Sequence, residues 1–436
     1  MSRRRTPTLA FPASRAPSRP HLSGLFVLCL GVVLGACMGG PNWRRSTVLA
    51  GDERPSQLAP LEEPWSERGL VPVRLVNLER SGRVEFDRGA GAPVEVYRSQ
   101  NGVVRADERQ LLRSLEIDPA AGSPGVRVDG RLHNGSVRVM AHPDRGLRVE
   151  ALLDLEDYVA GVVAAELALW SAPPAQLEAQ AIAARSYALA RLDERAGEPF
   201  LWDGVEDQAY RGCFEPDAAS AKRGLEARLN SAVQRTRGQV LWAAGRVLPA
   251  RYHARCGGRT STVEAVFGKP GPGHAPASCP TCSADLSSDS GTAWEFTATR
   301  AELDSLSRRL GLGAPLGSLQ PLTTDGGGRW LSVQVAGPLG QKSIDANRLR
   351  RELGWDRLRS TWIESTWPGS GLPTSGGLAF RGRGHGHGVG LCQVGAGGLA
   401  ERGWSARQIL AHYYPTATLR QWTLDRSGRS GQDPRR

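Results

Sequence analysis

The chain has 436 residues, of which 40% are hydrophobic and 23% charged, and its formal net charge is +11. This composition is typical of a soluble globular protein, and the length allows two or three domains or one large domain with additions. The first five charged residues, all arginines within residues 1–21, account for +5 of the charge, and the other charges form no long runs. Because no basic stripe with interleaved aromatic residues occurs, we expect no nucleic-acid partner.

The N-terminus has the pattern of an export signal. Residues 1–21 are arginine-rich, Leu22–Leu34 is mostly apolar, and Leu34-Gly-Ala-Cys37 follows. This order matches a secretory signal peptide, and an apolar run of about 13 residues is shorter than the roughly 20 that span a membrane. Leu-Gly-Ala-Cys also resembles a bacterial lipobox, whose cysteine becomes the lipidated first residue. We therefore predict a signal peptide over 1–37, lipidation at Cys37 and an exported, membrane-anchored lipoprotein of the cell envelope. In lipoproteins, a residue such as Met38 after the cysteine, neither Asp nor charged, is compatible with delivery to the outer membrane of a cell that has one. An ordinary cleaved signal with an incidental cysteine is the alternative.

A tether and a β-rich region come next. Residues 38–70 are rich in Pro, Gly, Ser and Glu, which predicts a flexible linker. From Val71 to Leu153, short alternating stretches are separated by turn residues, with Asn134-Gly135 as a hairpin candidate. We assign 71–124 to a small β-rich N-terminal region.

The rest of the chain mixes helices and strands. Pro173-Pro174 is a plausible first turn for a helix over Ala175–Ala196, whose many alanines favour close packing. Further patterns predict helices at Ala218–Thr236, Ala301–Leu310, Ala346–Leu353 and Ala406–Tyr413, and strands at Gly238–Trp242, Val247–His253 and Trp330–Val335. The expected fold class is α+β, with mixed helices and short strands in one main domain over 125–420 and a disordered tail over 421–436.

Glu166 is the first candidate for chemistry. It follows the apolar run Val162–Ala165, and we expect it just before a helix. An apolar wall raises the pKa of a carboxyl group, as a general acid at neutral pH requires. The structural alternative is a glutamate at a helix N-terminus, stabilised by the helix dipole.

Two spaced pairs suggest a metal site. His253-Ala-Arg-Cys256 and Cys279-Pro-Thr-Cys282 supply one imidazole and three thiolates, a set that suits tetrahedral Zn²⁺. Three thiolates favour a structural zinc over a catalytic one. Outside the cytoplasm a disulfide between Cys256 and either Cys279 or Cys282 is the alternative. Cys213 and Cys392 have no neighbouring partner and are either buried free thiols or partners of each other.

Two polar groups are candidate sugar contacts. His385 and His387 are two residues apart in a glycine-dense stretch, so an extended strand would point both rings to one face. A turn with solubilising histidines is the alternative. Asp207, Gln208 and Tyr210 form a polar cluster that suits hydrogen bonding and stacking to a sugar, although a solvated loop explains it equally well.

Six blocks together resemble one family. They are similar, in order, to blocks of the stage II sporulation protein D family, which includes the amidase-enhancer proteins. The domain enclosing them covers about residues 125–420. The blocks are Leu155–Glu166, Ala179–Tyr187, Asp207–Gly212, Tyr252–Thr260, Gly384–Gln393 and Ile409–Pro415.

This resemblance implies a lytic transglycosylase, which cuts peptidoglycan glycan strands between N-acetylmuramic acid and N-acetylglucosamine and leaves a 1,6-anhydro end. The family's essential glutamate falls at Glu166, and its zinc block falls at His253 and Cys256. The candidate substrate contacts are Arg185, Tyr187, Asp207, Gln208, Tyr210, His385, His387 and Gln393. Two departures stand out: Leu167-Ala168 replaces the usual Met-Pro, and Cys392-Gln393 replaces the usual Ser-Gln.

Two other functions remain open at this point. The first is a non-catalytic protein that binds glycan and stimulates a cell-wall amidase, which would then be its partner. The second is a zinc-dependent hydrolase. A glycosidase that hydrolyses its substrate uses a second carboxylate, for which Asp157 and Asp207 are the only candidates.

Overall fold

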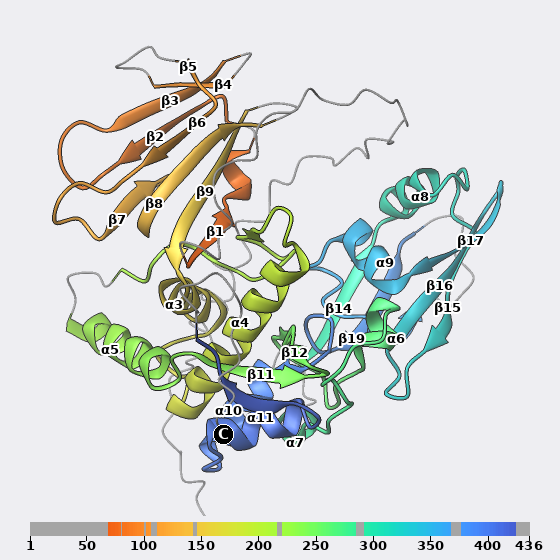
Figure 1. Cartoon of the computed structure of the whole chain (residues 1–436). Helices are drawn as coiled ribbons and strands as arrows, with labels where there is room; N and C mark the ends of the chain where they lie inside the picture. The colour runs from red at the N-terminus through yellow and green to blue at the C-terminus, as the bar shows by residue number, and fades with distance from the viewer. Residues whose placement is uncertain are drawn as a thin grey trace, which may run out of the picture. The chain divides into compact units, whose positions relative to one another are not determined.

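The N-terminal region forms a single large sheet that is antiparallel except where β10 pairs in parallel with β1 (Figure 1). The computed structural model describes residues 69–79, 81–99, 102–105, 111–142, 146–215, 220–284, 292–367 and 376–423. The predicted signal peptide, Cys37, almost all of the tether and the end of the tail lie outside these residues. All described residues belong to one unit, Ala59–Arg436. None of the described helices combines the length and apolar character that a membrane span requires.

The sheet confirms the predicted β-rich region and extends beyond it. Its strand order is β10-β1-β9-β8-β7-β2-β3-β4-β5, and β6 pairs with β8. The strands are β1 (Leu70–Arg74), β2 (Arg83–Asp87), β3 (Val94–Ser99), β4 (Gly102–Arg105), β5 (Leu111–Leu112), β6 (Ser114–Ile117), β7 (Gly125–Val128), β8 (Arg131–Ala141), β9 (Leu147–Asp154) and β10 (Leu201–Trp202). Because β2 pairs with β7, the boundary expected at residue 124 falls inside the sheet.

The Asn134-Gly135 pair is not a hairpin turn, contrary to the sequence prediction. Both residues lie inside β8 opposite Gly125, which makes them a β-bulge. The turn between β7 and β8 is instead Asp129-Gly130, where both residues have positive φ, 50° and 73°. That is the backbone of a type I′ turn, which Asp-Gly favours.

An alanine-rich helix forms the centre of the following region. Helix α4 (Pro174–Glu194) contacts α3 (Leu155–Glu166), α5 (Ser220–Arg235), α10 (Gln393–Glu401), α11 (Ala406–Tyr413) and strand β11 (Gln239–Ala243). Alanines such as Ala181, Ala184 and Ala188 are buried and allow these elements to approach closely. The predicted helix beginning in the Pro173-Pro174 turn is confirmed. Beside it, β11 pairs with β12 (Arg246–Val247) and β21 (Thr418–Gln421).

Helix α3 corrects the expectation for Glu166. The apolar run is itself helical: the Asp154 side chain caps its start by accepting a hydrogen bond from the Glu156 N–H, and Glu166 is its last residue. Glu166 therefore lies at a helix C-terminus and not ahead of a helix. There the helix dipole presents negative charge, which disfavours a carboxylate.

A short parallel ribbon joins two distant blocks of the sequence. β13 (Tyr252–His253) pairs with β20 (Leu391–Cys392), so that Tyr252 lies opposite Leu391 and His253 opposite Cys392. The strand predicted over Val247–His253 is divided between β12 and β13. Helices α6 (Val263–Phe267) and α7 (Pro280–Ala284) follow β13.

A module with its own apolar core is inserted between α7 and β20. Its elements are β14 (Ala293–Ala298), α8 (Arg300–Arg309), β15 (Ser318–Thr324), β16 (Trp330–Gly337), β17 (Gly340–Asp345), α9 (Ala346–Leu353), β18 (Ile363–Trp367) and β19 (Leu378–Arg383). Leu303, Val333, Leu349 and Phe380 are fully or almost fully buried in a core cluster separate from those around α4. The sequence indicated elements here but not a separate packing unit.

A buried ion pair ties α3 to α4 and generates a stability prediction. Arg185 is fully buried and donates from Nε to Glu156 Oε1 at 3.0 Å, while Gly238 N–H donates to the same oxygen. We expect Arg185→Met to lower the unfolding free energy by about 3–5 kcal/mol, because it leaves the Glu156 charge buried without its partner.

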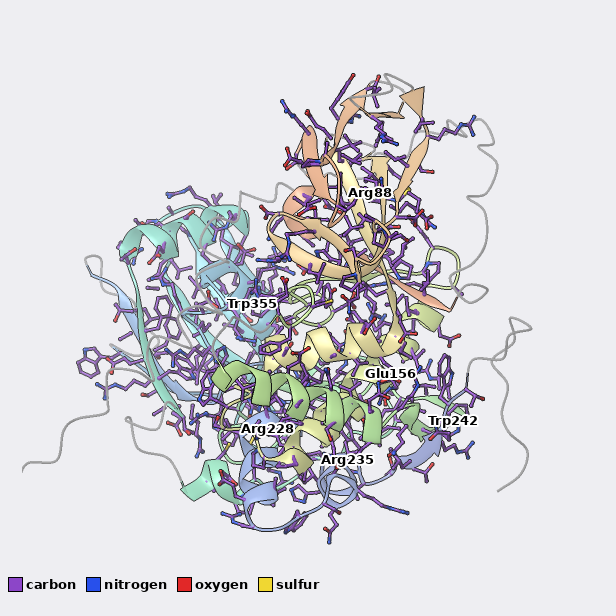
Figure 2. The ribbon with its side chains drawn as sticks, turned by 90° about the vertical axis from the view of Figure 1, so that its left-hand side faces the viewer. Arg88, Glu156, Arg228, Arg235, Trp242 and Trp355 are labelled. Carbon is purple, nitrogen blue, oxygen red and sulfur yellow. The ribbon has the colours of Figure 1, made fainter. Side chains whose placement is uncertain are left out.

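The control is Arg235→Met. Arg235 lies on α5 and is the exposed ion-pair partner of Glu178 on α4. Such a surface pair contributes about 1 kcal/mol or less. Glu156 and Arg235 are both labelled in Figure 2. Urea unfolding of the two variants measures the difference, and equal losses of stability would contradict the assignment.

Candidate active site

The Glu166 carboxyl group is the point where four segments meet. Its Oε1 accepts a hydrogen bond from the Ala209 N–H at 3.0 Å and lies 3.5 Å from the Tyr252 hydroxyl. Its Oε2 accepts from Gln393 Nε2 at 3.2 Å. These contacts come from the 207–212 block, from β13 and from the start of α10, so segments separated by up to 227 residues converge on one carboxyl group.

The surroundings raise the pKa of Glu166. The dominant cause is burial of the carboxyl group, and the hydrogen bonds from Ala209, Gln393 and Tyr252 oppose it only in part. The position at the end of α3 acts in the same direction as burial. A carboxyl group with a raised pKa retains its proton at higher pH, which is what proton donation to a substrate requires.

The contacts to Glu166 are themselves held in place. Tyr252 donates to Gln208 Oε1 at 2.8 Å, and Gln208 Nε2 donates to the Tyr158 hydroxyl at 3.1 Å. On the other side, Gln176 Nε2 donates to the Gln393 backbone carbonyl at 2.9 Å. The predicted residues Glu166, Gln208 and Gln393 thus belong to one hydrogen-bonded network, and Tyr252 is a member that sequence reasoning missed.

Four predicted substrate contacts lie in the core instead. Arg185 is committed to Glu156. Asp207 has a fully buried side chain paired with Arg191 and Arg195, and it also accepts from the Trp202 N–H. Arg185 and Asp207 each pair with an oppositely charged residue inside the fold. These two residues hold the scaffold, and no sugar can reach them.

Tyr210 and Tyr187 are the other two buried residues of this set. Tyr210 is 1% exposed and lies so close to Gly161 that a Cβ there would be 2.5 Å from its ring. Tyr187 is buried too, and its hydroxyl lies 3.4 Å from Asp207 Oδ1. The part of the 207–212 block that meets the acid is the backbone N–H of Ala209.

Neither candidate for a second carboxylate is placed for hydrolysis. Asp207 is buried in its arginine pairs. Asp157 lies nine residues before Glu166 on α3, about 13 Å along the helix axis. Inverting glycosidases place their two carboxyl groups about 6.5–9.5 Å apart and retaining ones about 5–5.5 Å. Neither Asp157 nor Asp207 therefore forms either arrangement with Glu166.

The two histidines of the glycine-dense block lie beside the ribbon. The His387 ring is 5.5 Å from the rings of His253 and Phe267, and His385 forms a backbone bridge with Arg255. Burial lowers the pKa of His385 to about 4 and that of His387 well below its ordinary value, so both are neutral at pH 7. Among the described residues, neither belongs to a group of three or more converging metal ligands.

Four thiols converge behind the ribbon. Cys256, Cys279, Cys282 and Cys392 are all buried, and their sulfur atoms lie within 4.8 Å of one another. Cys392 takes the place that the sequence predicted for His253. The His253 Nδ1 instead lies 3.1 Å from the Val389 carbonyl and its ring faces His387, while β20 carries Cys392 into the cluster.

The cluster is suited to thiolates and a cation. The sulfur of Cys392 accepts from the N–H groups of Cys256 and Gly395 at 3.2 and 3.3 Å. Hydrogen bonding with Cys256 lowers the pKa of Cys279, and the same contact raises the pKa of Cys256. All described cysteines are free thiols, so the disulfide alternative has no bond here. Four thiol ligands form a closed set consistent with a structural metal.

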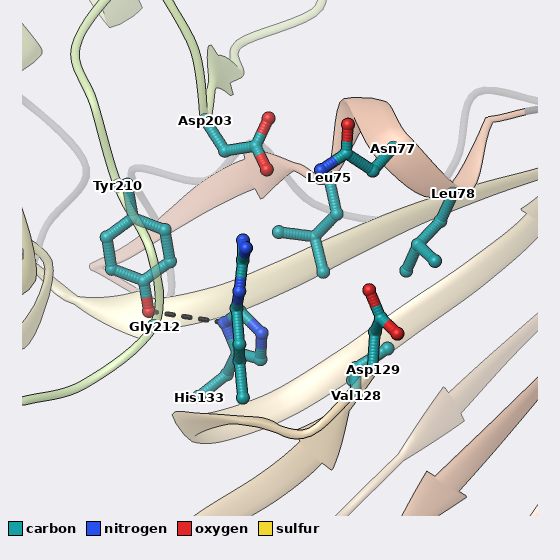
Figure 3. A pocket seen from close by; sticks show the side chains of 10 residues that line it. Leu75, Asn77, Leu78, Val128, Asp129, His133, Asp203, Tyr210 and Gly212 are labelled. Atoms are coloured by element: carbon teal, nitrogen blue, oxygen red, sulfur yellow. Dashed lines mark hydrogen bonds between the residues drawn. The ribbon is translucent and has the colours of Figure 1, made fainter. Parts of the chain in front are cut away.

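The pocket in Figure 3 is too small to be the glycan site. Its cavity is about 20 Å³ and is lined by residues of the N-terminal sheet and of the 203–212 segment. The Tyr210 hydroxyl meets the His133 ring at 3.3 Å in it, and burial raises the pKa of Asp203 to about 6. This volume holds about one water molecule.

Comparison with known proteins agrees with this geometry. The SpoIID family, described as stage II sporulation protein, matches residues 144–242, which run from β9 into β11. The segment from β9 into β11 therefore matches a SpoIID domain. SpoIID proteins degrade peptidoglycan, and the resemblance drawn from the six sequence blocks is confirmed.

Two relatives extend beyond that segment. An uncharacterized protein of Brachyspira hyodysenteriae is 29% identical over 296 residues, 66% of this chain and 73% of its own length. Stage II sporulation protein D of Bacillus amyloliquefaciens is 27% identical over 272 residues, 60% of this chain and 73% of its own length. The similarity therefore covers more than the SpoIID segment that holds Glu166.

The raised pKa of Glu166 predicts a pH-dependent difference in stability. Because its folded pKa lies above the ordinary value of 4.5, Glu166 contributes stability below about pH 4.5 that is lost as the pH rises through the folded pKa. Glu166→Gln stays neutral, so its melting temperature should rise relative to wild type between pH 4 and pH 8. Thermal unfolding of both proteins at intervals of half a pH unit measures this, and a constant or falling difference would contradict it.

Proposed function

We propose that this protein is a lytic transglycosylase that cleaves peptidoglycan glycan strands between N-acetylmuramic acid and N-acetylglucosamine. The observation that carries the proposal is a single, partly buried carboxyl group with a raised pKa, on which blocks that resemble the family converge. A one-carboxyl mechanism fits lytic transglycosylation, and neither Asp157 nor Asp207 is positioned as a second group for hydrolysis.

The reaction uses Glu166 twice. The protonated carboxyl group gives its proton to the glycosidic oxygen while the bond from that oxygen to C1 of N-acetylmuramic acid breaks, which releases N-acetylglucosamine. The resulting carboxylate takes the proton of the C6 hydroxyl of N-acetylmuramic acid as O6 attacks C1. A 1,6-anhydro ring forms, no water is consumed, and Glu166 is protonated again.

The network around Glu166 suits both stages. Ala209 N–H and Gln393 Nε2 donate hydrogen bonds, which stabilise the carboxylate formed in the first stage. Burial favours the protonated acid that begins the cycle. Burial and the hydrogen bonds thus act in opposite directions on the two protonation states that Glu166 adopts in turn.

The proposed setting is the outside of the cell. The signal-like residues 1–37 and the lipobox-like cysteine support an exported lipoprotein anchored through Cys37, where peptidoglycan is accessible. Peptidoglycan strands are then the substrate, and the tether over 38–70 provides reach from the membrane. A cell-wall amidase is a further candidate partner.

The metal proposed for the four-thiol cluster is Zn²⁺. It would be held by Cys256, Cys279, Cys282 and Cys392, and it would supply cross-linking of the fold with no open position for water. No step of the reaction passes through it.

Product analysis tests the catalytic proposal. Peptidoglycan with and without stem peptides should yield 1,6-anhydromuramic products with the wild-type protein, and Glu166→Gln should lower the rate by about 10²–10⁴-fold. Mass spectrometry identifies the ends. Glu178→Gln, which removes a carboxyl group from the surface of α4, is the control and should retain the wild-type rate.

Two other results would overturn this function. Reducing ends in place of anhydro ends would mean hydrolysis. Binding to glycan strands without any product, together with faster cleavage by an added amidase, would mean a non-catalytic enhancer.

Metal analysis tests the ligand set. We expect about one zinc per chain in the purified protein, loss of it in Cys392→Ser and retention in His253→Ala, because the imidazole lies outside the cluster. Native mass spectrometry gives the stoichiometry. Retention in Cys392→Ser with loss in His253→Ala would restore the ligand set expected from sequence spacing alone.

A further inference from the structure

Two adjacent residues connect the four-thiol cluster to the catalytic acid. Cys392 caps the start of α10, where its sulfur accepts a hydrogen bond from the Gly395 N–H, and Gln393 is the first residue of that helix. The Cys392 side chain belongs to the thiol cluster, whereas the Gln393 side chain donates to Glu166 Oε2. Consecutive Cα atoms are about 3.8 Å apart, so a shift of Cys392 moves Gln393 as well.

Gln393 has little freedom to absorb such a shift. It is 6% exposed, and Gln176 fixes its backbone carbonyl by a hydrogen bond of 2.9 Å. Its N-cap neighbour is fixed by the N–H groups of Cys256 and Gly395. The contact to Glu166 therefore depends on the position of the Cys392 sulfur.

The other strand of the ribbon repeats this arrangement. Tyr252 on β13 lies 3.5 Å from Glu166 Oε1, and Cys256, four residues later, belongs to the thiol cluster. On β13 the residue that contacts the acid comes first and the thiol follows, whereas on β20 the thiol comes first and the contact, Gln393, follows at the start of α10. The two contacts reach the two different oxygens of the carboxyl group.

The ribbon has little strength of its own. β13 and β20 pair over only two residues each, and their parallel pairing adds few backbone hydrogen bonds. The other two thiols lie outside the ribbon: Cys279 directly precedes α7, and Cys282 is within it. A metal held by all four sulfurs would therefore fasten both strands of the ribbon to α7.

We propose that the four-thiol cluster, with its metal bound, positions the catalytic acid, and that the coupling passes through Cys392 and Gln393, where β20 joins α10, and through Tyr252 on β13. Cys392, Gln393 and Tyr252 act as positioning residues. The inference rests on the proposed function only for its kinetic consequence, because the coupling itself is a property of the folded protein.

Metal affinity tests the coupling without any turnover. Coupling between two sites is reciprocal. If metal binding strengthens the contact between Gln393 and Glu166 by some factor, loss of that contact must weaken metal binding by the same factor. We expect Gln393→Ala to weaken the affinity for cobalt(II) and zinc(II) by about 5- to 150-fold, measured by competition with a chelator. Gln341→Ala, an exposed glutamine on β17, is the matched control with wild-type affinity.

Kinetics on glycan strands test the positioning. Cys282→Ser removes a ligand that lies outside the ribbon, and we expect it to lower kcat about as much as Gln393→Ala, with KM unchanged. In the Gln393→Ala background, Cys282→Ser should lower kcat little further, because both changes break the same connection. Circular dichroism and thermal unfolding establish that each variant is folded. If Cys282→Ser fails to fold, chelation of the wild-type and Gln393→Ala proteins replaces it.

The outcomes separate this proposal from the proposed function. Wild-type metal affinity in folded Gln393→Ala would overturn the coupling whether or not the protein cleaves glycan. Fully additive losses of kcat would also overturn it. Weakened metal affinity in a protein that yields no anhydro products would support the coupling and overturn only the transglycosylase function.

Discussion

The enclosure of one carboxyl group is the constraint on which the rest of this structure depends. Glu166 ends α3, where both burial and the helix dipole disfavour a negative charge. Hydrogen bonds from the Ala209 N–H and Gln393 Nε2, with the Tyr252 hydroxyl nearby, limit that cost. The acid can exist in this position only because the alanine-rich surface of α4 lets α3 and the 207–212 block pack closely. The scaffold and the chemistry are therefore parts of one packing arrangement.

The inserted module shows how distant blocks remain neighbours, since Cys282 and Cys392 are separated by 110 residues in the chain. Its first and last strands, β14 and β19, pair antiparallel, so that Ala293 lies opposite Arg383. The chain thus leaves the domain and returns to it at adjacent points. Cys282 and Cys392 can approach to 3.6 Å between their sulfur atoms because the module closes on itself. Its separate core means that it packs around its own apolar contacts.

The sequence predicted those parts of the fold that depend on local signals. Helix α9 follows Asp345 and α11 follows Ser405, each an N-cap residue, and both helices have the predicted bounds. Glu166 and Gln393 were identified because they lie in blocks that resemble a family. The predicted ligand set lacks Cys392 because spacing detects pairs close in the chain, and Cys392 lies 136 residues after Cys256. Arg185 and Asp207 were misassigned because a charged residue in a conspicuous block gives no sign, in one dimension, of a buried partner.

The inserted module also contacts the thiol cluster through one buried arginine. Arg329, at the start of the region leading into β16, is 1% exposed and donates from its guanidinium group to the Cys256 carbonyl. Burial lowers the pKa of Arg329, and the proximity of Cys256 and Cys392 opposes this effect in part. Four thiolates around Zn²⁺ would carry a net charge of −2, so a buried cation beside them offsets part of that charge. The guanidinium group thereby ties the module, the ribbon and the cluster together. A ribbon of two-residue strands can then hold two contacts on one carboxyl group because its rigidity comes from the groups packed behind it.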